Sequence, residues 1–284
     1  MNNLQKIFVF AFACVLSGFE GNGQSEVLDG AYHSDNFMKR VIPYPHLREA
    51  DVMYKKRVWQ IIDLNQKFNQ PFYYPQEPIE NRKNLIDVIK KGLLEGQITA
   101  YSPGPDKQDD EFTTRLTAAG LDTVLFKTTI VPKYSPTGEV IGEIVDKSEI
   151  DYELIKRYQI KEEWIWDKQR SERYVRILGI APMIQSFDNS GNPNGYAPVF
   201  WLYYPHCRNW FASEEAEVYN IFNDAQRRTY EDLFQKRYFS SYIIKEDNAF
   251  NRPIVQYESG LSALAESERI QQELFNLEHD LWHY

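Results

Sequence analysis

Apolar and polar residues alternate with a helical period near the start of this chain. Between Asp51 and Pro75 the apolar positions recur at three- and four-residue intervals, at Met53, Val58, Ile61, Ile62 and Phe68. That spacing puts side chains on one face of a helix. We therefore predict a helix from about Leu47 to Asn69, because Pro71 cannot continue it. The aromatic, proline-containing exit that follows favours packing against protein over binding of a small metabolite.

Four later segments share this helical period: residues 81–94, 151–158, 224–238 and 262–282. In the last of them one apolar stripe runs along the helix, with polar residues mostly away from it. The stripe consists of Leu264, Ile270, Leu274, Leu277 and Leu281. We expect this stripe to dock on the chain's own domain. A surface for a partner helix is the alternative for the same segment.

Runs with the composition of strands occupy the middle of the chain. Residues 123–131 and 139–146 are rich in β-branched residues, and the Ser-Pro-Thr-Gly sequence at 135–138 between them predicts a hairpin. Residues 174–185 and 196–204 are expected to form further strands. The pattern predicts an α+β protein with a helical N-terminal part, central antiparallel strands and a helical C-terminal part.

The first 23 residues have the pattern of a secretory signal peptide. Lys6 supplies a positive start, residues 7–16 form a short apolar segment, and Gly21-Asn22-Gly23 offers small residues at the cleavage position. We predict cleavage before Gln24, an extended leader over 24–44 and a single α+β domain over 45–284, with a flexible joint at 102–111. An uncleaved anchor and a lipidated Cys14 are the alternatives.

Composition narrows the classes of partner. The 284 residues carry a net charge of −9, and 15% of them are aromatic, which is too many for a disordered chain. The acidic balance disfavours nucleic acid, whose phosphates need clustered Lys and Arg, and flat docking onto anionic lipid. Removal of the signal peptide leaves Cys207 as the one cysteine, which excludes an intramolecular disulfide. A buried thiol is expected there, with an intermolecular bridge as the alternative.

No arrangement in the sequence predicts catalysis, a cofactor or a metal site. His279 and His283 have the spacing of a helical zinc pair, but Asp280 stands where the metalloprotease motif has glutamate, and chain ends fray. His206 and Cys207 are adjacent in sequence, so they cannot easily form a nucleophile–base pair. The chain has no nucleophile elbow, P-loop or dinucleotide-binding glycine fingerprint.

Five blocks of the sequence resemble one protein family. They are KKRVWQIIDL from Lys55, NQPFYYP from Asn69, RILGIAPMI over 176–184, GYAPVFWLYYPHCRN over 195–209 and NDAQRRTYEDLFQKRYFSSYIIK over 223–245. The blocks are long and irregular, and they come in the family order. In them the chain resembles the GldN/PorN family, the gliding-motility and type IX secretion proteins of the Bacteroidetes.

This resemblance implies a non-enzymatic structural protein of the periplasm, peripheral to the inner face of the outer membrane. Family members associate with a GldK/PorK-type lipoprotein, contact the periplasmic domain of a GldM/PorM-type motor protein and self-associate in a large ring. The resemblance implies no cofactor, no nucleic acid and no direct membrane span.

Aromatic residues near arginines supply the candidate partner-interface positions, because such residues form interface hot spots. The candidates are Arg57, Trp59, Tyr73, Tyr74, Trp201, Tyr203, Tyr204, Arg227 and Arg228. Packing inside the domain is the other explanation for most of these side chains. Two other functions stay open: an exported carbohydrate-active enzyme, which needs two carboxylates across a cleft, and a glycan-binding module, which needs a concave aromatic groove.

Overall fold

The computed structural model describes residues 39–79, 82–134, 140–149, 152–187, 193–213, 216–218, 223 and 226–281. They belong to one compact unit, Phe37–Tyr284. The predicted signal peptide, the first part of the predicted leader and the turn of the predicted hairpin lie outside the described residues.

The strands are β1 (Val52–Asp63), β2 (Ala100–Tyr101), β3 (Phe126–Tyr134), β4 (Val140–Glu149), β5 (Ile155–Asp167), β6 (Glu172–Phe187), β7 (Pro193–Pro198), β8 (Trp201–Tyr203), β9 (Glu217–Val218), β10 (Arg228–Thr229) and β11 (Tyr242–Glu246). The α-helices are α2 (Leu85–Leu94), α3 (Ala118–Leu125), α4 (Tyr204–Phe211), α5 (Tyr230–Gln235) and α6 (Leu261–Leu281). Short 3-10 turns are η1 (Glu49–Asp51), η2 (Lys67–Phe72), η3 (Tyr152–Leu154) and η5 (Ile254–Gln256).

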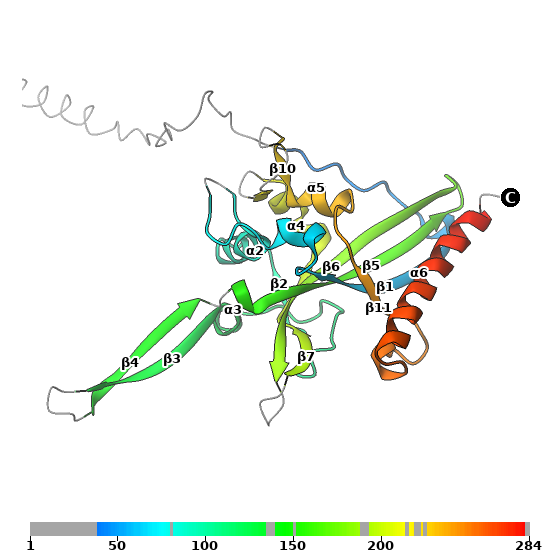
Figure 1. Cartoon of the computed structure of the whole chain (residues 1–284). Helices are drawn as coiled ribbons and strands as arrows, with labels where there is room; N and C mark the ends of the chain where they lie inside the picture. The colour runs from blue at the N-terminus through cyan, green and yellow to red at the C-terminus, as the bar shows by residue number, and fades with distance from the viewer. Residues whose placement is uncertain are drawn as a thin grey trace, which may run out of the picture. The chain divides into compact units, whose positions relative to one another are not determined.

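Seven strands form one antiparallel sheet with the order β11-β1-β5-β6-β8-β2, and β7 also pairs with β6 (Figure 1). β1 lies between β5 and β11, where Val58 is opposite Glu162 on one side and Glu246 on the other. The hairpin predicted in the middle of the chain is confirmed as a separate two-stranded sheet of β3 and β4.

The helix predicted over Leu47–Asn69 is wrong, because this segment forms η1, β1 and the start of η2. All five positions from 58 to 62 are buried, as expected for an inner strand covered on both faces. A short apolar run of this kind cannot be told from a buried helix by its period alone. The helix predicted at 151–158 is wrong for the same reason, since β5 begins at Ile155.

Side chains of β1 alternate between two cores on opposite faces of the sheet. Val58 packs with Ile243 of β11 and with Ile270 and Leu274 of α6, whereas the adjacent Trp59 packs with Trp201 on the other face. The largest cluster lies beside the middle of the sheet, where β5 and β6 meet α2, α4 and α5. Figure 1 shows these three helices together, apart from α6, which lies alongside β11 and β1.

The C-terminal helix is confirmed, and it closes the edge of the sheet. The backbone amide of Ile243 in β11 donates to the Ser267 hydroxyl of α6 at 2.9 Å. An edge strand with a free row of amides invites pairing with other chains. Of the predicted stripe, Ile270 and Leu274 are buried, but Leu264 is exposed and lies on another side of the helix.

Other predicted elements are present with different bounds. The helix at 81–94 begins at Leu85 after Asn84, whose side-chain oxygen accepts from the Asp87 amide. The helix at 224–238 is only α5, because Thr229 and Asp232 form a capping box at its start. The strand at 196–204 is divided into β7 and β8. The α+β class is correct, but its N-terminal part is not mainly helical, because the long strand β1 follows the three-residue turn η1.

Residues 39–48, where the predicted leader meets the domain, contain neither helix nor strand. Arginines of the domain hold this segment by its carbonyl groups. Arg208 of α4 donates to the Ile42 oxygen at 2.9 Å, and Arg176 of β6 donates to the Pro45 oxygen at 2.7 Å. The Tyr44 ring lies 4.0 Å from the Arg208 guanidinium carbon. This segment is therefore attached to the domain through charged side chains.

Candidate partner-binding surface

Three of the predicted interface residues are inside the fold. Trp59, Trp201 and Tyr204 are almost completely buried. The Trp59 indole donates to the Asp110 carboxylate, and the Tyr204 hydroxyl donates to Glu231 at 3.2 Å. These side chains offer no surface to a partner in this conformation, so their replacement acts on the fold.

Three other predicted residues are partly accessible, and the fold gives each of them a contact of its own. Arg57 of β1 forms an ion pair with Glu163 at 3.0 Å, and Arg227 forms one with Glu217 at 2.8 Å. The Tyr203 ring of β8 is edge-on to Phe112 at a centroid distance of 5.4 Å. β5 and β6 separate Arg57 from Tyr203, so the sheet does not bring these two side chains together.

The remaining predicted residues are Tyr73, Tyr74 and Arg228. They lie beside η2 and α5, at the place where these two elements pack against each other. Phe72, the last residue of η2, contacts the rings of Tyr230, Phe234 and Phe239 at centroid distances of 6.0, 5.3 and 6.5 Å. The Tyr230 hydroxyl of α5 lies 3.3 Å from the Pro71 carbonyl oxygen of η2 and 2.8 Å from the Lys83 carbonyl oxygen before α2. These contacts fix η2 against α5 and the residues that follow it.

One buried amide completes this junction. The Asn69 Nδ2 atom donates to the carbonyl oxygens of Asp63 and Ser240, both at 2.8 Å, and its Oδ1 atom accepts from the Ser240 amide at 2.8 Å. Asn69 thereby joins the end of β1, η2 and the turn after α5, so the side chains on these segments keep fixed relative positions.

Exposed aromatic side chains lie on both segments that Asn69 joins. Phe68 is 58%, Tyr74 45% and Tyr238 42% exposed. The Arg228 guanidinium carbon lies 5.4 Å from the centroid of the Tyr238 ring, within cation–π range. We call Phe68, Tyr74, Arg228 and Tyr238 the η2–α5 surface. Tyr73 is edge-on to Tyr74 at 5.1 Å and packs partly into the core beneath it.

Phe68 and Tyr238 were not among the predicted interface residues. Phe68 is on the apolar face of the helix predicted over 47–69, but it lies in η2 instead. Tyr238 is the last residue of the helix predicted over 224–238, but α5 ends at Gln235. The chain turns away after α5 at Arg237, whose φ is +54°, and this change of direction leaves Tyr238 in solvent. One signal in the sequence could have indicated that Phe68 is exposed. Pro71 follows it by three residues, and proline interrupts a helix and favours a turn.

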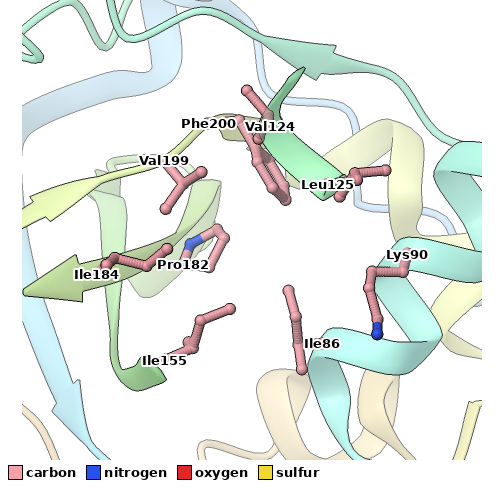
Figure 2. A pocket seen from close by; sticks show the side chains of 9 residues that line it. All are labelled: Ile86, Lys90, Val124, Leu125, Ile155, Pro182, Ile184, Val199 and Phe200. Atoms are coloured by element: carbon pink, nitrogen blue, oxygen red, sulfur yellow. The ribbon is translucent and has the colours of Figure 1, made fainter. Parts of the chain in front are cut away.

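Figure 2 shows a small apolar cavity on which α2, α3, β5 and β6 converge. Its free volume of about 10 Å³ is about what one water molecule needs. Lys90 is the charged residue at its wall. Burial lowers the pKa of this amine, but hydrogen bonds to Asp87 and Glu149 outweigh burial and raise it, so Lys90 stays protonated. The cavity suits no metabolite-sized ligand.

The other chemical candidates give no site in the described residues. Burial raises the pKa of the Cys207 thiol to about 12, and its sulfur lies 3.3 Å from the Tyr203 carbonyl oxygen. The predicted buried thiol is therefore confirmed. No group of three or more His, Cys, Asp or Glu side chains in the described ranges could hold a metal ion, and His283 lies outside those ranges. No helix within them is long and apolar enough to cross a membrane.

The exposed aromatic side chains and the arginine of the η2–α5 surface are of the types that form protein interfaces. Comparison with family models gives a match over residues 47–283 to the model described as Gliding motility associated protein GldN, and the chain belongs to this family. Membership makes it a component of the gliding-motility or type IX secretion machinery and is consistent with a non-enzymatic role. Comparison with curated proteins gives no match.

Proposed function

We propose that this protein is an exported structural component of the type IX secretion and gliding-motility machinery. It lies in the periplasm, peripheral to the inner face of the outer membrane. There it binds a GldK/PorK-type lipoprotein, contacts the periplasmic domain of a GldM/PorM-type motor protein and self-associates in a large ring. The match to the GldN family over residues 47–283 carries this proposal, because it covers almost the whole described domain.

The η2–α5 surface supports a role in assembly. It combines three exposed aromatic rings with Arg228 on a support held by buried hydrogen bonds, and residues that form interface hot spots are of these types. Rigid presentation lowers the ordering cost of binding. We propose that this surface contacts the lipoprotein.

The test is co-expression of the chain with its GldK-type lipoprotein, followed by size-exclusion chromatography and negative-stain electron microscopy. Co-elution in a large species with ring-shaped particles supports the proposal. If the protein stays monomeric and binds neither the lipoprotein nor the motor domain, the proposal is refuted.

Paired variants locate the contact. Tyr74→Ala with Tyr238→Ala is expected to weaken lipoprotein binding by at least about tenfold, because each ring is lost from a hot-spot surface. The control is Leu94→Ala, since Leu94 is an exposed apolar residue at the end of α2 outside this surface. Equal binding by the native chain and the double variant, with native thermal stability in both, removes the η2–α5 surface from the interface.

A further inference from the structure

α6 carries a buried stripe, which packs inside the domain, and a second stripe with large apolar residues towards both of its ends. The buried stripe includes Ser267, Ile270 and Leu274, with Ala263 and Leu277 partly buried beside it. The second stripe is exposed and has the same alternating spacing of three and four residues. It consists of Leu261, Leu264, Glu268, Gln271 and Phe275. Four of its positions follow a position of the buried stripe by one residue, so it is rotated by about 100° around the helix.

Three large apolar side chains of this second stripe are exposed to solvent. Leu261 is 84%, Leu264 57% and Phe275 59% exposed. Positions spaced alternately by three and four residues form the seam of a two-helix contact. α6 lies at the side of the sheet formed by β11 and β1 (Figure 1), with this seam off the face that packs on them.

The polar residues at the centre of the seam pair with none of the residues that the structure describes. Within the described ranges the structure gives the side chains of Glu268 and Gln271 no hydrogen bond or ion pair. The neighbouring polar residues differ in this respect. Arg269 pairs with Glu266 at 2.8 Å and with Glu273 at 3.0 Å, and Gln272 donates to Asn276 at 3.0 Å. The neighbours therefore satisfy one another, whereas the two residues of the seam do not.

Four of the five seam positions, Leu264, Glu268, Gln271 and Phe275, are self-complementary in an antiparallel arrangement. If a second α6 runs in the opposite direction about a twofold axis between positions 269 and 270, Leu264 faces Phe275 of the other copy. Glu268 then faces Gln271, whose amide donates to the carboxylate. In an isologous contact each such pair occurs twice. A parallel pair would instead place two Glu268 carboxylates against each other, which is unfavourable.

We propose that the exposed seam of α6 is a self-association site, occupied by the same seam of a second copy in antiparallel orientation. The contact closes with two copies, so it is distinct from the head-to-tail contact that builds a ring and does not depend on the function proposed above. It uses a single helix per copy and falls at the small end of stable interfaces. Dimer formation is therefore expected to depend on concentration between about 1 and 100 µM.

The first experiment is sedimentation velocity on the purified protein alone. The native chain is expected to shift from monomer to dimer as its concentration rises. Leu264→Glu and Phe275→Glu should each weaken the dimer at least about tenfold without loss of thermal stability, because both side chains are exposed in the monomer. Leu94→Glu, which places the same charge on an exposed leucine of α2, should leave the dimer intact. A native chain that stays monomeric throughout overturns the proposal.

Disulfide cross-linking tests the orientation. Positions 264 and 275 are about 16 Å apart along a helix, so an antiparallel pair brings each near the other position and not near itself. A mixture of Leu264→Cys and Phe275→Cys proteins should cross-link under copper-phenanthroline, whereas each protein alone should not. Cys207 does not compete, because it is buried. Cross-linking of either variant with itself indicates a parallel pair and overturns the proposed orientation, as does a mixture that fails to cross-link.

Discussion

Replacement of Asn69 tests whether one buried amide holds η2 to the turn after α5. Alanine removes three hydrogen bonds of 2.8 Å, to Asp63 and twice to Ser240. Each such bond contributes about 1 kcal/mol net, and Ser240 is exposed, so water replaces part of what is lost. We expect Asn69→Ala to lower the free energy of unfolding by about 2–3 kcal/mol. Asn69→Asp should lower the free energy of unfolding by at least as much, because a carboxylate cannot donate a hydrogen bond and would face two carbonyl oxygens.

The assay is urea unfolding followed by tryptophan fluorescence, with the denaturant slope checked for constancy. Asn65→Ala is the matched control, because Asn65 is an exposed asparagine of the same connection whose amide bonds only to the Asp63 side chain, at 2.8 Å. We expect that control to stay within about 0.5 kcal/mol of the native chain. If Asn69→Ala is as stable as the Asn65 control, or if Asn69→Asp is as stable as the native chain, the junction does not depend on this amide.

Two further predictions concern the interior. Because burial raises the pKa of Cys207 to about 12, its thiol should not react with Ellman's reagent at pH 8 in the native protein and should react at once in 6 M guanidinium; fast native labelling would contradict the buried site. Gly179→Ala puts a methyl group 2.5 Å from the Phe112 ring. We therefore expect the free energy of unfolding to fall by about 1–3 kcal/mol and proteolysis within 102–116 to become faster. Equal protease resistance in Gly179→Ala and the native chain would show that Phe112 does not hold that loop.

The second of these predictions also bears on the joint expected at 102–111. In the structure the end of this segment and the residue after it contact the sheet, since Asp110 accepts from Lys161 at 3.0 Å and the Phe112 ring lies 6.0 Å from Trp201. The flexible joint stays a prediction. Comparison of cleavage rates in the native chain and in Gly179→Ala measures how firmly these contacts restrain the loop.

The sequence predicts the elements at the edges of this fold better than those at its centre. The period predicts α6 and the turn residues predict the β3–β4 hairpin, because both signals are local in the sequence. β1 was not found, since positions 58–62 are covered on both faces and lose the alternation that marks a strand. Its pairing with β5 and β11 depends on residues about 100 and about 185 positions later, and local pattern contains no such information.

The candidate surface could be predicted only in part, for a related reason. The aromatic run at 199–204 posed a choice between the domain's own core and a partner, and burial of Trp201 and Tyr204 assigns those two side chains to the core. Tyr74 and Arg228 were found as aromatic and arginine positions. Phe68 and Tyr238 were missed because their exposure results from a turn and from the short length of α5, which are tertiary features.

The position of β1 has a consequence for the order in which the chain can fold. Val58 is opposite Glu162 and Glu246, so the strand that emerges first from synthesis cannot gain its second neighbour until nearly the last element exists. α6, which covers the β11 edge, comes later still. The β5–β6 and β3–β4 hairpins can form locally, whereas the β1–β11 pair has to close a loop of about 185 residues, which slows its formation. The sheet is therefore complete only when β11 pairs with β1, and α6 can cover that edge only afterwards.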